Sequence, residues 1–234
     1  MNFEDIRVEI ADGIGAIVID RGDNRNAVRP QSLAEIAQAM DALTTDDAVK
    51  AIILRAEGEH FSAGADFKFL AKITEMAPAD IRQQVYAHFQ GAARRIYNCP
   101  KPTIAAVQGA AITVGCELSL GCDFRIVAEG AFFQESWIKL GILPPLGGLF
   151  LLPRLVGLGR ASQMVLRAER VDAAKAEQIG LASEVVPADQ LKERAYELAR
   201  ELAAAAPQAY SAIKRGLRRG LETGMEAEFD ANVL

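Results

Sequence analysis

The chain has 234 residues, half of them hydrophobic (50%), which fits one α/β domain with a sizeable buried core. Its formal net charge of -5 argues against a nucleic-acid-binding or anionic-membrane protein, and its three cysteines, which form no C-x-x-C pair, argue against a disulfide framework or a zinc site. We therefore expect a protein of the reducing cytoplasm, without a signal peptide or a membrane span.

Hydrophobic periodicity predicts alternating strands and helices in the first half of the chain. Asp12-Gly13 is a turn signal between the first two apolar runs. The expected strands cover residues 7–10, 16–19, 51–54, 103–107 and 124–128. The expected helices cover residues 31–43, 78–97 and 114–120. This alternation indicates an α/β core.

From Gly147 onward the pattern is almost entirely helical. Asp172 is a predicted N-cap, Gly180 a predicted helix stop, and residues 182–186 a short extended link. Two further helices are expected at 189–205 and 207–221. We divide the chain into an α/β core, residues 1–185, and a C-terminal helical region, residues 186–234, which is expected to serve oligomerisation and closure of the site.

Several common mechanisms lack their sequence signatures. The chain has no G-x-G-x-x-G fingerprint, no P-loop and no G-x-S-x-G elbow. Its two histidines, His60 and His88, do not have metal-ligand spacing, and we interpret both as structural.

Two turns rich in small residues follow buried strands. One covers residues 61–66 and the other residues 108–117, where a helix begins near Val114. Free N–H groups at a helix start point outward, with the positive end of the helix dipole behind them. Two such turns side by side bind a developing oxyanion, and Glu117 lies about one turn into the second helix. Either turn alone is more often an ordinary turn.

Five motifs occur in one order and spacing. They are F-S-A-G-A-D at 61–66, K-P-T-I-A-A-V-Q-G at 101–109, G-C-E-L at 115–118, C-D at 122–123 and L-P-R-L-V-G at 152–157. As an ordered set they resemble the crotonase (enoyl-CoA hydratase/isomerase) family. The resemblance implies a spiral of strand–strand–helix repeats with a helical C-terminal region. It also implies an acyl-CoA thioester substrate, no other cofactor, and a homotrimer or a dimer of trimers, with no nucleic-acid or membrane partner.

The resemblance also assigns roles to residues. Ala65 and Val114 would donate the two N–H groups of an oxyanion hole, which stabilises a thioester enolate, and Glu117 would be the catalytic acid/base. The residues expected to bind substrate or CoA are Asn24, Arg25, Ala63, Asp66, Phe67, Lys68, Trp137 and Pro144. Family members usually continue past the position of Leu221 with further helices, so the end of this chain is either naturally short or missing.

The sequence departs from the family pattern at two positions. Val114 stands where glycine is usual, which would misplace the second donor if the site needs a glycine-only conformation. Trp137 stands where hydratases carry a second glutamate, and an indole N–H donates but cannot exchange a proton at neutral pH. We interpret Trp137 as a pocket wall in preference to a hydrogen-bonding group. Glu135, two residues earlier, is a less favoured substitute for the missing glutamate.

With one glutamate left, we expect a hydratase-like lyase of the fatty acid metabolism type. A decarboxylase or a β-keto-thioester hydrolase of the same fold stays open, as does a non-catalytic acyl-CoA-binding protein. RNA binding is a weaker alternative, motivated by a basic face of the last helix formed by Lys214, Arg215, Arg218 and Arg219. A solvated face or a contact with CoA phosphates explains that face more simply.

Overall fold

The computed structural model describes residues 3–73 and 75–221, without the side chains of residues 78, 82, 84 and 85. Of the region 186–234, which is expected to serve oligomerisation and closure of the site, residues 222–234 lie outside this range.

In the described part of the chain, the central strands of the larger sheet are apolar runs that are buried on both faces, as is usual for parallel strands covered by helices. The sheet has the order β1-β2-β3-β4-β6-β9, in which β1 and β2 form an antiparallel hairpin and the other neighbours are parallel. The strands are β1 (Ile6–Ala11), β2 (Ile14–Ile19), β3 (Ala51–Ala56), β4 (Thr103–Val107), β6 (Phe124–Ala128) and β9 (Glu184–Val186).

A second sheet of three short strands was not predicted from the sequence. It has the order β5-β7-β8, formed by β5 (Ala110–Ile112), β7 (Phe132–Gln134) and β8 (Arg170–Asp172). Each strand has three residues, which is too short to show a periodicity of its own. Because β5 follows β4 and β7 follows β6, the chain steps twice from the large sheet to the small one before the next helical segment, α5 in the first case and η3 with α6 in the second. This confirms the expected α/β spiral of strand–strand–helix turns.

The helices agree with the sequence in the first half and correct it in the second. The expected helix from Pro78 is divided into α3 (Pro78–Asp80), a π-helix η2 (Ile81–Tyr86) and α4 (Ala87–Asn98). The almost entirely helical pattern expected after Gly147 missed β8, whereas β9 lies within the extended link expected at 182–186. The other helices are α1 (Pro30–Thr45), α2 (Phe67–Ile73), α5 (Val114–Leu120), α6 (Gly148–Val156), α7 (Leu158–Leu166), α8 (Ala173–Gln178), α9 (Leu191–Ala203) and α10 (Pro207–Arg219), with short 3-10 turns η1 (Gly22–Asn24), η3 (Trp137–Leu140) and η4 (Ala188–Gln190).

Both ends of α8 follow the predicted signals. The Lys175 N–H donates to Asp172 Oδ1 at 2.8 Å, so Asp172 is the N-cap. Gly180 has φ of 78°, a left-handed conformation that suits glycine at a helix end. The expected link 182–186 contains β9, the last strand of the large sheet. The predicted domain boundary after residue 185 therefore falls inside β9, and the division itself stays a prediction.

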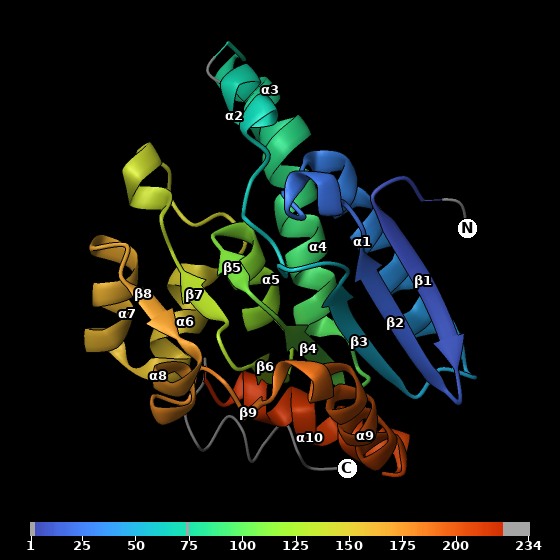
Figure 1. Ribbon diagram of the computed structural model, residues 1–234. Helices are drawn as coiled ribbons and strands as arrows, with labels where there is room; N and C mark the ends of the chain where they lie inside the picture. The colour runs from blue at the N-terminus through green and yellow to red at the C-terminus, as the bar shows by residue number, and fades with distance from the viewer. Residues whose placement is uncertain (1–2, 74, 222–234) are drawn as a thin grey trace.

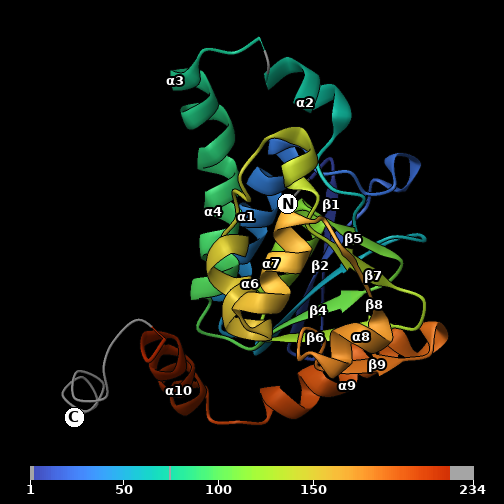
Figure 2. The ribbon, with the colours of Figure 1, turned by 90° about the vertical axis from the view of Figure 1, so that its left-hand side faces the viewer.

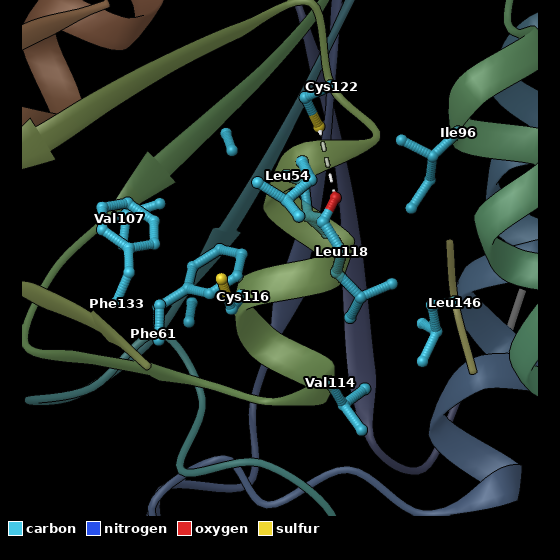
Figure 3. Close-up of a cluster of buried hydrophobic side chains, with 14 of the residues drawn as sticks. Leu54, Phe61, Ile96, Val107, Val114, Cys116, Leu118, Cys122, Phe133 and Leu146 are labelled. Carbon is cyan, nitrogen blue, oxygen red and sulfur yellow. Dashed lines mark hydrogen bonds between the residues drawn. The ribbon is translucent and has the colours of Figure 1, made fainter. Parts of the chain in front are cut away.

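Helices cover the large sheet on both faces. α1 and α4 pack side by side on one face, and α9 packs across β3, β4 and β6 on the other (Figure 1). α2 and α3 extend from one end of the molecule and α10 lies at the opposite end (Figure 2). α5 is buried along its whole length, and its side chains Val114, Cys116 and Leu118 join the main hydrophobic core (Figure 3). The residues at the start of α5 are thus held rigidly inside the fold.

Two of the four residues on the basic face of α10 form ion pairs within the protein. They are therefore neither a solvated face nor a phosphate contact. Lys214 is buried, with a side chain 7% exposed, and its ammonium pairs with Asp123 next to β6. Arg218 Nη2 pairs with the other oxygen of Asp123 at 2.8 Å. The Thr103 N–H and hydroxyl also donate to Asp123. These two cations therefore anchor α10 to the sheet.

Replacing Lys214 with methionine should lower the free energy of unfolding by about 1.5–3 kcal/mol, because a buried charge-assisted hydrogen bond is lost while Arg218 keeps Asp123 paired. Urea unfolding measures this change. Lys192→Met, at an exposed position of α9, is the control and should change stability by less than about 0.5 kcal/mol. Equal stability of the two variants would contradict the anchoring role.

Candidate functional site

Two loops meet at the end of the large sheet where α2 and α5 begin. Ser62 forms an isolated parallel β-bridge with Ala111, in which the Ser62 N–H donates to the Ala110 carbonyl at 2.9 Å. On its other side the same loop is fixed to the strand-like residue Val28, whose carbonyl accepts the Asp66 N–H at 2.9 Å. The first loop, residues 62–66, is therefore held between two neighbouring segments of backbone.

Gly64 and Thr113 bring the two loops into direct contact. Gly64 has φ of 100°, and a Cβ atom there would lie 2.4 Å from Thr113 Oγ1 and 3.2 Å from the Ile112 carbonyl oxygen. Thr113 itself has φ of 46° and ψ of -106°, a strained conformation for a β-branched residue. The glycine-like positive φ that was considered for Val114 therefore occurs at the preceding residue, Thr113. Val114 is the first residue of α5.

Ala65 and Val114 each keep a backbone N–H without an acceptor among the described residues. Ala65 is 7% exposed and Val114 is fully buried, so these donors are not simply hydrated surface groups. Buried N–H groups without a partner are rare, and the first N–H groups of a helix have no intrahelical acceptor. Each donor belongs to the residue directly after one of the two contacting residues, Gly64 and Thr113. The Val114 N–H also lies at the positive end of the α5 dipole.

Glu117, one turn into α5, is 1% exposed and accepts three hydrogen bonds. Trp137 Nε1 donates to Oε1 at 2.8 Å. The backbone N–H groups of Leu146 and Gly148 donate to Oε2 at 2.9 Å and 2.7 Å. A carboxylate offers about four acceptor positions, so one remains, on Oε1. Three donors and no acceptor around the group favour its ionised form.

Burial raises the pKa of Glu117 to about 7, and the donors Gly148, Trp137 and Leu146 oppose this rise by stabilising the anion. A carboxyl group with this pKa exchanges a proton readily near neutral pH, which is the requirement for a general acid/base. Glycine at position 148 allows this close approach, because a Cβ there would lie 3.0 Å from Glu117 Oε2.

A cavity of about 570 Å³, the basic cavity, lies beside the first loop. Its wall includes the predicted residues Asn24, Asp66, Phe67 and Lys68. Lys68 and Lys72, one turn apart on α2, have no carboxylate partner in the described part of the chain and leave two cations for an anionic ligand. The remaining lining residues are Arg21, Ala27, Arg29, Pro30, Gln31 and Phe69.

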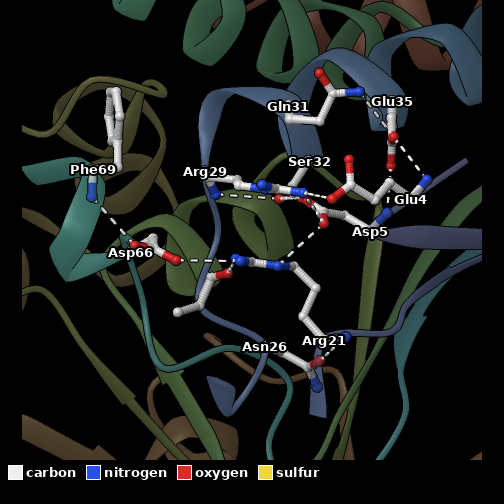
Figure 4. Close-up of polar contacts among 11 residues, drawn as sticks. Glu4, Asp5, Arg21, Asn26, Arg29, Gln31, Ser32, Glu35, Asp66 and Phe69 are labelled. Carbon is white, nitrogen blue, oxygen red and sulfur yellow. Dashed lines mark hydrogen bonds and ion pairs between the residues drawn. The ribbon is translucent and has the colours of Figure 1, made fainter. Parts of the chain in front are cut away.

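Ion pairs behind the basic cavity fix the loop that carries Ala65. Arg21 pairs with both Asp5 and Asp66 at 3.2 Å, and Arg29 also binds Asp5 (Figure 4). Asp66 Oδ1 in turn accepts the Lys68 N–H at 2.9 Å at the start of α2. The arginines of this cavity are thus held in ion pairs within the protein. The lysines are therefore the cations that remain for an anionic ligand.

A second cavity of about 310 Å³, the apolar cavity, lies on the other side of α2. The Trp137 indole forms part of its wall and is 2% exposed. The other lining residues are Leu70, Ile73, Ile81, Tyr86, Phe89, Gly141, Ile142, Leu143 and Pro145. No charged side chain of the described residues lines it, so it suits an aliphatic or aromatic group.

Comparisons of the sequence and the structure with known proteins agree on one protein family. The family model described as "Enoyl-CoA hydratase/isomerase" matches residues 9–233. The chain belongs to the enoyl-CoA hydratase/isomerase family. A "Probable enoyl-CoA hydratase" of Rhizobium meliloti (strain 1021) is 38% identical over 203 residues, which cover 87% of this chain and 77% of that protein.

Two further relatives agree with this family. A "Crotonyl-CoA hydratase" of Syntrophomonas wolfei subsp. wolfei (strain DSM 2245B / Goettingen) is 37% identical over 195 residues, which cover 82% of this chain and 72% of that protein. The crystal structure of an enoyl-CoA hydratase from Bacillus anthracis has a TM-score of 0.90 at 31% identity, covering 97% of this chain and 87% of that chain. The resemblance inferred from the motifs is therefore confirmed.

Not every expected site residue of this family member lies in a cavity wall. Arg25 and Ala63 line none of the cavities above, but the Ala63 N–H donates to the Arg25 carbonyl at 3.0 Å, so both residues hold the first loop. Pro144 lines a third cavity described below. Trp137 is both a pocket wall and a hydrogen-bond donor, so the interpretation as a wall alone was incomplete.

Glu135 does not take the place of the second family glutamate at the surface of a cavity. It is 1% exposed, and both of its oxygens lack a hydrogen-bond donor among the described residues. Burial and the negative charge of nearby Glu117 raise the pKa of Glu135 well above its ordinary value. Of the two buried carboxyl groups, Glu117 is the one with hydrogen-bond donors that stabilise its anion.

Several residues of the site were missed from the sequence. Lys72 was detectable, because it lies four residues after Lys68 on the same helix. Leu146 and Gly148 act through backbone N–H groups, which no side-chain pattern reveals. In the described part of the chain, no helix is long and apolar enough to cross a membrane, and no group of three His, Cys, Asp or Glu side chains is arranged to hold a metal ion.

Proposed function

We propose that this enzyme adds water to the double bond of a 2-enoyl-CoA thioester. The observation that carries the proposal is the pair of unpaired N–H donors on touching loops, with the buried carboxylate of Glu117 one helical turn beyond them. Relatives named as hydratases support the same reaction.

The proposed reaction needs one glutamate. As the water oxygen bonds to the β-carbon, its proton moves to Glu117, and the electrons of the double bond shift to the thioester oxygen. The Ala65 and Val114 N–H groups stabilise that negative charge, as oxyanion donors do. Glu117 then returns the proton to the α-carbon, so one molecule of water is added and the carboxylate is restored.

Trp137 has a defined part in this scheme. Its indole occupies the place of a second carboxylate and donates to Oε1, where it stabilises the ionised base without exchanging a proton. The remaining acceptor position of Oε1 is then the proposed site that takes the proton from water. The basic cavity, with Lys68 and Lys72, would hold the CoA phosphates, and the apolar cavity would hold the acyl group. No other cofactor is required by these steps.

Mass spectrometry of crotonyl-CoA incubated with the protein tests the proposal. We expect the thioester to gain the mass of one water molecule. A thioester that stays unchanged at every pH would contradict hydration.

Decarboxylation of a malonyl-type thioester is the second candidate, favoured by one observation. Trp137 removes the second carboxylate, and loss of carbon dioxide needs the oxyanion donors but no activated water. The same spectrometer distinguishes the two reactions, because a malonyl-type thioester would lose the mass of carbon dioxide. Release of free CoA from a β-keto thioester would instead indicate hydrolysis.

Replacing Trp137 with phenylalanine should shift the acidic limb of the pH–rate profile upward. Without the indole donor the Glu117 anion is less stable, so its pKa rises and a higher pH is needed to ionise the base. A charge-assisted hydrogen bond of this kind corresponds to a shift of about one pH unit or more. The kcat/KM of the variant should therefore fall most below pH 7 and recover at higher pH. An acidic limb at the same pH in both proteins would show that Trp137 does not act on Glu117.

A further inference from the structure

A third cavity of about 530 Å³, the distal cavity, continues the apolar cavity along α4. Pro145 lines both cavities. On α4 the apolar cavity ends at Phe89, and the distal cavity takes the next turns. Its lining residues are Gln90, Ala93, Arg94, Tyr97, Pro144, Pro145, Leu146, Gly147, Phe150 and Leu151.

Glu117 lies behind the junction of the two cavities. Trp137, from the wall of the apolar cavity, donates to Oε1, and Leu146, from the wall of the distal cavity, donates to Oε2. An acyl chain whose β-carbon lies at Glu117 and whose tail passes Pro145 therefore enters the distal cavity. Arg94 is five residues beyond Phe89, or about 7.5 Å further along the helix.

The distal cavity differs from the apolar one in charge. Arg94 is the one charged side chain among its described lining residues, and no carboxylate of the described residues pairs with it. The adjacent Arg95 points elsewhere, since its Nε pairs with Asp41 of α1 at 2.7 Å. Ala93, Pro144 and Leu151 supply apolar wall in the same cavity. A guanidinium without a carboxylate partner beside apolar wall residues suits a chain of methylene groups that ends in a carboxylate.

We infer that the preferred substrate is an enoyl-CoA whose acyl chain ends in a carboxylate, and that Arg94 is the residue that selects it. This inference rests on the proposed hydration. The thioester end would occupy the oxyanion donors and the apolar cavity, and the far carboxylate would pair with Arg94 in the distal cavity. An uncharged chain of the same length would reach the same place without an ionic partner.

Steady-state kinetics with two six-carbon thioesters tests this inference. One is 2-hexenoyl-CoA, and the other is the same chain with a carboxylate in place of its terminal methyl group. Wild type should have the higher kcat/KM for the carboxylate-ended chain. Arg94→Gln should lower that value about fivefold, mainly through KM, because the pair is at the protein surface. The same variant should leave 2-hexenoyl-CoA unchanged, and the control Arg95→Gln should leave both substrates unchanged.

Equal use of the two thioesters by wild type would overturn the selection by Arg94, as would an equal loss on both substrates in Arg94→Gln. Crotonyl-CoA separates this failure from a failure of the proposed function. Hydration of crotonyl-CoA without a preference for the carboxylate removes only the present inference. Where no thioester turns over, the dissociation constants of the two thioesters, followed by Trp137 fluorescence, give the same comparison, and equal affinities would again overturn it.

Discussion

Replacing Glu117 with glutamine is expected to lower kcat for crotonyl-CoA hydration by about 10²- to 10⁴-fold, because the amide cannot take a proton from water. The substitution leaves the proposed contacts of the substrate with the Ala65 and Val114 N–H groups and with the basic cavity unchanged, so the dissociation constant of the thioester should change little. Mass spectrometry measures the turnover. Trp137, the one tryptophan of the sequence, reports binding through its fluorescence.

The same substitution has a second, smaller effect. Glu117 accepts three donors, and a glutamine side chain has only one acceptor oxygen, so its amino group must face another donor. The free energy of unfolding should fall by about 1–3 kcal/mol. The control Glu129→Gln, in an exposed turn, should keep both turnover and stability. Turnover by Glu117→Gln at the wild-type rate would remove Glu117 from the mechanism.

Replacing Gly64 with alanine is expected to lower kcat by about 10²- to 10³-fold, which is the usual cost of losing one oxyanion donor. The new Cβ would lie 2.4 Å from Thr113 Oγ1, and the φ of 100° disfavours any side chain. Thr113 must therefore move, and it carries the Val114 N–H with it. Single-turnover kinetics with crotonyl-CoA measures the chemical step directly.

Gly130→Ala separates this displacement from simple backbone strain. Gly130 also has a positive φ, of 81°, but nothing lies within 4 Å of its added Cβ. Its variant should lose about 1–2 kcal/mol of stability and keep its rate of turnover. If the two alanine variants lose turnover equally, contact between the loops is not what positions the donors.

The motifs marked the candidate site because each is local. The glycine and small residues of 61–66 mark a tight turn, and the start of α5 follows from the apolar pattern around Val114. Backbone N–H groups at such places are free whatever the surrounding fold, since a helix start lacks acceptors. Ala65, Val114 and Glu117 could therefore be chosen from the sequence, with the resemblance to the family giving their roles. Gly64→Ala, with Gly130→Ala as its control, tests whether these donors act in catalysis.

The strands of the second sheet show where local patterns fail. β5, β7 and β8 have three residues each and are defined by their partners, such as Ile112 beside Gln134. β9 was read as a link because its three residues become a strand only by pairing with β6. Short segments gain little from their own propensity, so pairing with a distant strand decides their structure.

The sequence by itself determined the family, the spiral α/β architecture and the two turns that carry the proposed oxyanion donors. These depend on residue size, hydrophobic order and short spacings, all of which are local. The tertiary structure alone decided the state of Glu117. Its donors Trp137, Leu146 and Gly148 lie 20, 29 and 31 residues away along the chain, and their approach depends on how η3 and α6 pack against α5. Burial and these long-range hydrogen bonds set the pKa of a carboxyl group, and neither is written in the residues next to it.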